Sequence, residues 1–98
     1  MDLAALTAEM HRFVEDQGWY DPDSPKMQSK RNLAISLSVE AAEVLEFFQW
    51  TDELPDEGAL GAELADVMLY LLQLASLSGI DLEQAVLGKL RDNYTRTW

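Results

Sequence analysis

Two pairs of acidic residues carry the clearest chemical signal in this sequence. Glu40 and Glu43 are three residues apart, as are Glu63 and Asp66, and each pair lies in a segment that is otherwise largely apolar. Residues three apart share one face of a helix. If two such helices face each other, the four carboxylates converge, and desolvated anions repel unless a cation joins them. Ligand sets made only of oxygen favour hard cations such as Mg²⁺, Mn²⁺ or Ca²⁺.

The surroundings of the two pairs argue against ordinary solvated helix faces. A lone E-x-x-E motif is usually solvated, because Glu is common on exposed helices. Between Arg31 and Lys89, however, the sequence holds no basic residue, so neither pair has a Lys or Arg partner along its own helix. On a helical wheel each pair lies in a narrow polar stripe, roughly 120° wide for 33–50 and roughly 80° for 62–77. The rest of each wheel is largely apolar, which is typical of a buried helix.

The elements that must position these acids are predicted to be four helices with short connections. Their predicted ranges are 3–16, 29–50, 60–77 and 81–94. A loop rich in Gly, Pro and Asp joins the first two helices at 17–27, and an acidic connector with Pro55 joins the next two at 51–59. Gly79 is expected to end the third helix. Without strand alternation or repeats, the pattern predicts one all-α, four-helix-bundle-like domain over 1–98.

Composition excludes several classes of function. The formal net charge is −11 at pH 7, and so acidic a surface repels nucleic-acid polymers, although it does not exclude a small phosphate ligand that arrives with its metal. The sequence has no cysteine and one histidine, His11. Disulfides, thiolate metal sites and sites that need several imidazoles are therefore excluded.

Location and assembly follow from the apolar residues. The N-terminus has neither the basic region nor the continuous apolar run of a signal peptide, and no stretch reaches the roughly 18 consecutive apolar residues of a membrane span. We therefore expect a cytoplasmic protein without membrane contact. Hydrophobic content is high for a short chain that must also place Trp19, Trp50 and Trp98. We expect a homo-oligomer, because a second copy would cover part of this surface.

Three stretches together resemble the MazG-like nucleotide pyrophosphohydrolases, in particular the short dCTP pyrophosphatase-like branch of that all-α superfamily. They are KRNLAISLSVEAAEVLEFFQW from Lys30, ELADVMLYLLQLA from Glu63 and KLRDNYTR from Lys89. An E-x-x-E, a spacer of 19 residues and an E-x-x-D fit the superfamily pattern. The F-Q-W run and the C-terminal Lys and Asn make the match specific.

The resemblance implies an oligomeric helical bundle, a dimer or a tetramer, that uses Mg²⁺ (with Mn²⁺ as a substitute) to hydrolyse nucleoside triphosphates to monophosphates and pyrophosphate. Glu40, Glu43, Glu63 and Asp66 match the metal ligands, and Glu40 or Glu43 would orient or deprotonate the attacking water. The remaining matched positions would bind the substrate through its base or its phosphates: Trp19, Lys30, Arg31, Asn32, Phe47, Trp50, Tyr70, Lys89 and Asn93. His11 falls approximately at a position near the base pocket.

Several alternatives stay open at this point. The branch implies a preference for dCTP-like or non-canonical nucleotides and a house-cleaning role, but dUTP or a phosphoribosyl nucleotide would suit the same fold. A different class of function is a non-catalytic interaction module whose acidic stripe docks a basic partner. The role of Arg96 is also open, and Glu46 is either a spare metal ligand or a solvated side chain.

Overall fold

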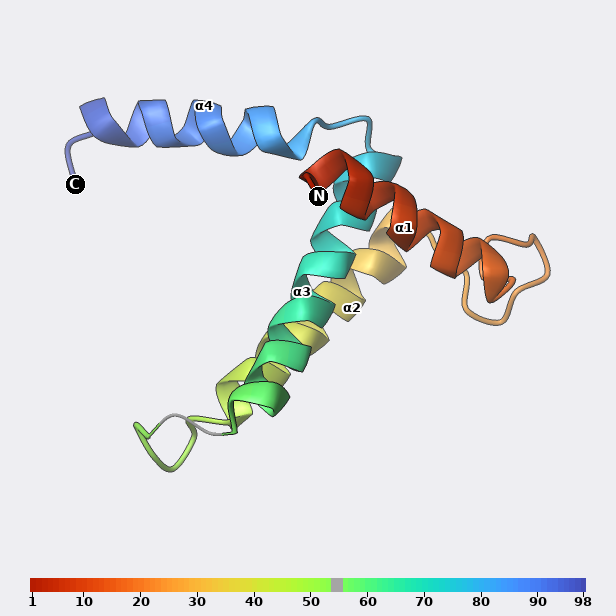
Figure 1. Cartoon of the computed structure of the whole chain (residues 1–98), viewed down its shortest axis with the longest axis horizontal. Coiled ribbons are helices and arrows are strands. Elements are labelled where there is room, and N and C mark those ends of the chain that lie inside the picture. Colours follow the sequence, from red (N-terminus) through yellow and green to blue (C-terminus); the bar gives the residue numbers. More distant parts are fainter. Residues whose placement is uncertain (54–55) are drawn as a thin grey trace.

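The computed structural model describes residues 1–53 and 56–98, and this part of the chain contains helices and no strand. The four helices are α1 (Leu3–Asp16), α2 (Lys30–Glu46), α3 (Glu57–Leu77) and α4 (Leu82–Thr95), as Figure 1 shows. The predicted all-α class is therefore confirmed. Pro55, which the sequence places in the connector between α2 and α3, lies outside the described residues.

A side-chain cap begins each helix in the described part of the chain. The capping residues are Asp2, Ser29, Asp56 and Asp81. Their oxygens accept hydrogen bonds of 2.8 to 3.2 Å from backbone N–H groups two or three residues further on. Each such cap contributes about 1 kcal/mol by satisfying an N–H group that has no partner within the helix.

Two helix boundaries differ from the sequence prediction by more than one residue. The α2 helix ends at Glu46 and not at Trp50. Beyond Glu46 the backbone hydrogen bonds join residues three apart instead of four apart, and Phe48 N–H donates to Leu45 C=O at 3.0 Å. The α3 helix begins at Glu57, three residues before the predicted start, because Asp56 supplies the cap. At the other end of α3, Gly79 adopts a positive φ of 69° and ends the helix as predicted.

Helices α2 and α3 run side by side in opposite directions and form the longest contact of the fold, and α1 packs across the C-terminal half of α3 (Figure 1). The core between α1 and α3 consists of Met10, Val14 and Leu72, with partly buried Trp19 and Tyr20 packed against them. Among the described helices, α3 is the one long and apolar enough to cross a membrane by length and composition, and 17% of its apolar window is buried within the chain.

Helix α4 leaves the other three helices. It contacts α3 near its first turn and then extends away from α1 and α2 (Figure 1). None of its residues is buried, and the apolar side chains of Val86, Leu87 and Leu90 are 43 to 51% exposed. Ile35 and Val39 on α2 are each 51% exposed as well. The bundle is therefore open within a single chain, and much apolar surface remains for a partner to cover.

Candidate metal and nucleotide site

The antiparallel packing of α2 against α3 brings three of the four predicted metal ligands together. Glu40 and Glu43 on α2 and Glu63 on α3 each offer a carboxylate oxygen, and these oxygens lie within 4.8 Å of one another. All three side chains are half-buried. The E-x-x-E spacing places both α2 acids on the α3 side of the helix, as the helical wheel predicted.

The electrostatics of the cluster show that the chain itself does not neutralise it. The Oε2 atoms of Glu40 and Glu63 are shielded from solvent and have no hydrogen-bond partner. Within the described ranges the one ion pair is Arg12–Glu9 at 3.5 Å, so no Lys or Arg faces the cluster. Burial of carboxylate oxygens without a counter-charge is costly, and the cost is relieved by a proton or by a cation.

In the absence of a cation, protons are held more tightly at this cluster than in water. Burial, together with the neighbouring carboxyls of Glu63 and Glu43 and the charge of Asp66, raises the pKa of Glu40 to about 7. Contact with the Glu40 carboxyl lowers the pKa of Glu63, but burial and the charges of Glu43 and Asp66 outweigh it, so the pKa of Glu63 is also raised. Two acids with raised pKa values in one cleft are typical of a functional site.

Asp66, the fourth predicted ligand, lies one helical turn beyond Glu63. It is outside the set of oxygens within 4.8 Å, but its charge acts on both Glu40 and Glu63. It lines a pocket between α1 and α3 that also includes Trp19. Asp66 therefore lies between the carboxylate cluster and the aromatic residues at the α1 end of the molecule.

The residues present fit a hard divalent cation. Their donors are all carboxylate oxygens, which Mg²⁺ and Mn²⁺ prefer, and Glu40 and Glu63 each have an Oε2 that is shielded and has no hydrogen-bond partner. Glu40, Glu43 and Glu63 would hold the ion directly, with Asp66 at the edge. A small pocket of about 240 Å³ beside the cluster is lined by Glu43, Glu46, Phe47 and Glu63, so Glu46 and Phe47 also lie close to it.

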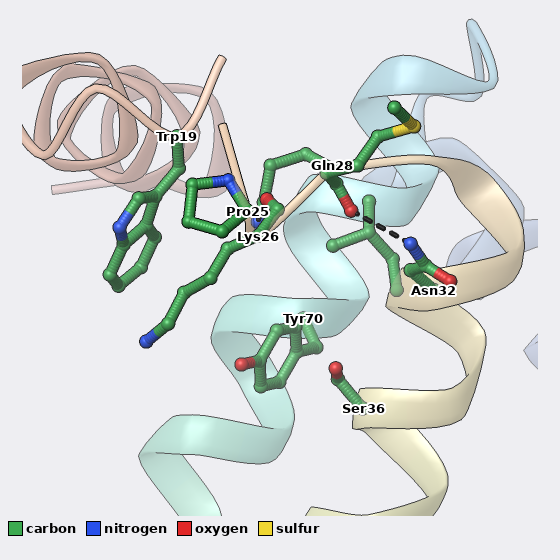
Figure 2. A pocket seen from close by; sticks show the side chains of 9 residues that line it. Trp19, Pro25, Lys26, Gln28, Asn32, Ser36 and Tyr70 are labelled. Carbon is green, nitrogen blue, oxygen red and sulfur yellow. Dashed lines mark hydrogen bonds between the residues drawn. The ribbon is translucent and has the colours of Figure 1, made fainter. Parts of the chain in front are cut away.

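Two pockets meet at Trp19, next to this cluster. The first, of about 320 Å³, is bordered by the 25–28 loop, α2 and Tyr70 of α3. Figure 2 shows Trp19, Lys26 and Tyr70 along one side of it and Asn32 and Ser36 of α2 along the other. The ammonium group of Lys26 lies 4.7 Å from the centre of the Trp19 ring. A cation beside an aromatic face provides both a stacking surface and positive charge for a nucleotide.

The second pocket, of about 410 Å³, lies between α1 and α3 and is mostly apolar. Leu6, Met10 and Phe13 of α1 line one wall, and Phe13 meets Trp19 edge to face with ring centres 5.5 Å apart. The polar side chains that line this pocket are Glu9, Gln28, Asp66, Tyr70 and Gln73. An apolar cavity with a few polar groups is the usual form of a small-molecule site.

A chain of hydrogen bonds runs behind these pockets. His11 lies between Tyr20 Oη, 2.7 Å from Nδ1, and Ser76 Oγ, 2.7 Å from Nε2. Gln73 continues the chain from Tyr20 to Gln28. Burial raises the pKa of Tyr20, against a smaller opposing effect of its bond with Gln73. His11 thus lies in the interior network and lines none of the pockets described above.

The predicted substrate-binding residues at the start of α2 have different surroundings. Lys30 and Arg31 are exposed on the first turn of α2, about 15 Å along the helix from Glu40. Asn32 lines the first pocket, but its Nδ2 donates to the carbonyl of Met27 at 3.0 Å, so part of its hydrogen-bonding capacity holds the loop.

Three other residues that were predicted to contact the substrate do not line the described pockets within a single chain. Trp50 is 89% exposed and follows the C-terminal end of α2, whereas Trp19 precedes the N-terminal end of that helix. Lys89 and Asn93 lie on α4, which extends away from the cluster (Figure 1). Their predicted roles stay predictions.

The structure adds three residues that the sequence prediction of the site did not include. Lys26 and Gln28 line pockets with Trp19, and Gln73 is the one buried polar residue in the described part of the chain, with 3% of its surface exposed. Gln73 did give a signal in the sequence, since it shares the narrow polar arc of α3 with Glu63 and Asp66. Lys26 and Gln28 gave none, because they lie in an irregular loop.

The sequence of this chain is similar to those of several known proteins. Residues 35–97 match the MazG-like family. The chain is 36% identical over 104 residues to dCTP pyrophosphatase 1 of Bos taurus, a match that covers 97% of this chain and 57% of the relative. The human protein of the same name is also 36% identical, with 56% of its length covered. The chain thus spans little more than half the length of these mammalian relatives.

Two further matches extend over most of both proteins. A dATP/dGTP diphosphohydrolase of cyanophage S-2L is 30% identical over 96 residues, which cover 98% of this chain and 81% of that protein. The crystal structure of a pyrophosphatase from Archaeoglobus fulgidus superposes with a TM-score of 0.79 and 33% sequence identity, covering 93% of this chain and 87% of that one. On the matched residues, the shared fold and these identities, the chain belongs to the MazG-like family.

Proposed function

We propose that this protein is a metal-dependent nucleoside triphosphate pyrophosphohydrolase, which converts a (deoxy)nucleoside triphosphate and water to the monophosphate and pyrophosphate. The observation that carries the proposal is the Glu40–Glu43–Glu63 cluster, with two shielded, unpartnered oxygens, close to pockets lined by Trp19. The names of the similar proteins, dCTP pyrophosphatase and dATP/dGTP diphosphohydrolase, support the same reaction class.

The carboxylates suit this reaction because of their charge. A nucleoside triphosphate carries about four negative charges at neutral pH and cannot approach the cluster unaided. Mg²⁺, or Mn²⁺ in its place, would supply the charge neutralisation and the acidification of water that the reaction needs. Glu40, Glu43, Glu63 and Asp66 would hold it.

The same side chains would also accept the proton of the attacking water. A water molecule attacks the α-phosphorus in line, the bond to the bridging oxygen breaks, and pyrophosphate leaves. Glu40 would accept the proton of that water, because its carboxylate belongs to the cluster. Glu43 has a carboxylate oxygen within 4.8 Å of one from Glu40 and would orient the water.

The base is expected to bind at the α1 end of the cluster. Trp19 borders both pockets and offers a stacking surface, and Tyr70 faces both pockets from α3. Stacking of one base on an aromatic side chain contributes about 1–3 kcal/mol. Lys26, near the Trp19 ring, would add positive charge beside the bound base.

A homo-oligomer would complete this site. The exposed apolar residues of α2 and α4 give a second copy a surface to cover. Lys89 and Asn93 would then reach the pyrophosphate of a neighbouring subunit's substrate, together with Lys30 or Arg31, and Trp50 would close the base pocket. The proposal includes a dimer or a tetramer and a dCTP-like or non-canonical substrate in a house-cleaning role.

A panel of common and damaged triphosphates tests the proposal, with separate detection of pyrophosphate and of single phosphate. We expect pyrophosphate in Mg²⁺ and none in EDTA. Activity on dUTP or on a phosphoribosyl nucleotide alone would keep the reaction and change the substrate. No cleavage of any pyrophosphate bond, with no effect of Mg²⁺ on melting, would favour the acidic interaction module.

A further inference from the structure

Gln73 has the most constrained polar side chain in the described part of the chain. It is 3% exposed, and its Nε2 lies 2.8 Å from Gln28 Oε1 and 3.2 Å from Tyr20 Oη. A primary amide can in principle rotate by half a turn and exchange its donor and acceptor ends. The neighbours of Gln73 decide whether it can do so here.

The backbone carbonyl of Lys26 fixes the orientation of both amides. A carbonyl oxygen accepts and never donates, so the atom that lies 2.7 Å from it must be the Gln28 nitrogen. The Gln28 oxygen then faces Gln73, and it requires a donor there. Gln73 must therefore direct its nitrogen toward Gln28, and its own Oε1 must point elsewhere.

The rest of the network agrees with this direction. The second N–H of Gln73 donates to Tyr20 Oη, and Tyr20 Oη also forms a hydrogen bond with His11 Nδ1. His11 Nε2 in turn bonds Ser76 Oγ. The Lys26 carbonyl thus fixes the direction of the Gln28 and Gln73 amides. Rotation of the Gln73 amide would place oxygen against oxygen at Gln28 and remove the hydrogen bond between the two amides.

Gln73 lines the apolar pocket between α1 and α3, and its Oε1 is the amide atom that the network leaves free. Both nitrogen-bound protons are used inside the network, whereas Oε1 accepts no hydrogen bond within the described residues. Asp66, Tyr70 and Gln73 line this pocket from α3 at spacings of four and three residues. Gln73 is thus about 10 Å along the helix from Asp66, which is comparable to the distance from a nucleotide's phosphate to the far edge of its base.

We propose that Gln73 Oε1 selects the base, by accepting a hydrogen bond from an exocyclic amine. Cytosine and adenine carry such an amine, whereas uracil and thymine place a carbonyl oxygen at the corresponding position. A keto base would set its oxygen against a fixed acceptor, and the network prevents the amide from turning to donate instead. This inference rests on the proposed function and adds to it a specificity-determining residue and a substrate class, the amino-bearing nucleotides.

The test compares dCTP with dUTP, which differ at the base edge and share the sugar and the phosphates. Wild-type protein, Gln73→Leu and Gln73→Met are assayed with both in Mg²⁺. We expect kcat/KM of the wild type to favour dCTP, and this ratio to fall roughly tenfold in both variants, the size of one hydrogen bond to a base. Two replacements of similar volume guard against failure of one to fold, which circular dichroism would show.

Ser76→Ala is the matched control, because it removes the far end of the network without touching Gln73 or a pocket residue. We expect it to keep the dCTP-to-dUTP ratio of the wild type. Equal loss on both substrates in the Gln73 variants, or a wild type without preference for dCTP, would overturn the role of Gln73 while the proposed function stands. A wild type that releases pyrophosphate from no nucleotide would overturn the proposed function itself.

Discussion

Glu40 on α2 and Glu63 on α3 face each other across the helix pair, and each has an Oε2 that is shielded from solvent and unpartnered. Together with Glu43 they place carboxylate oxygens within 4.8 Å of one another. Packing the two apolar helices together forces this encounter, so the fold carries an electrostatic cost at the site unless a proton or a cation relieves it.

Mg²⁺ should therefore stabilise the folded protein. A cation that binds the native state and not the unfolded chain adds about 2.7 kcal/mol at one hundred times its dissociation constant. We expect the melting temperature to rise with Mg²⁺ and to return to its starting value with EDTA. The matched control is Na⁺ at equal ionic strength, since general screening of the −11 charge would raise both curves alike.

Replacing a ligand should uncouple stability from activity. In Glu63→Gln we expect turnover to fall by more than the roughly 10- to 100-fold typical of residues that only support a metal ligand. We expect the metal-free variant to be at least as stable as wild type, because a like charge is gone. Asp66→Asn should behave in the same way. Steady-state assays and urea denaturation measure the two quantities, and near-normal turnover in both variants would contradict the ligand assignment.

The metal-free protein should lose stability as the pH rises. Because the pKa of Glu40 is raised from 4.5 to about 7 on folding, the native state binds more protons than the unfolded chain between these values. The free energy of unfolding contributed by Glu40 therefore falls across that window as pH increases. Denaturation in EDTA at pH 5 and pH 8 measures the effect. Glu40→Gln should show a shallower pH dependence, and identical profiles would refute the assignment.

Trp50 should act on substrate binding. If its ring only holds the base, Trp50→Ala raises KM more than it lowers kcat, by roughly five- to a hundredfold for one stacked base. Trp98→Ala is the matched control, since that ring is also exposed, at 81%, and lies against Arg96 instead. A Trp50→Ala variant with unchanged KM and reduced melting temperature would indicate a structural role.

Assembly should depend on the exposed apolar face of α4. We expect light scattering to give a mass that is a multiple of the 11.1 kDa chain. Leu90→Asp should shift the mass toward the monomer and reduce activity at the same time, since α4 of a second copy would bring Lys89 to the site. Gln84→Asp, an exposed polar position on the same helix, should change neither. An active monomer would contradict the shared site.

The sequence by itself determined the four helices and the pairing of the acids. Apolar periodicity, capping residues and Gly79 are local signals, because each acts within a turn or two of the chain, and they predicted all four elements to within a few residues. The shared helix face of Glu40 and Glu43 was predictable for the same reason, since residues three apart lie on one face of a helix. The approach of Glu63 to this pair depends on the packing of α3 against α2.

Tertiary structure alone decided which loop residues reach the pockets and how the polar side chains are directed. Lys26 and Gln28 follow no period, so their approach to Trp19 depends on how the loop folds over α3. The direction of the Gln73 amide depends on the Lys26 carbonyl through Gln28, and Gln28 and Gln73 are 45 positions apart in the sequence. The open position of α4 is decided in the same way, because it depends on long-range packing that no local pattern encodes.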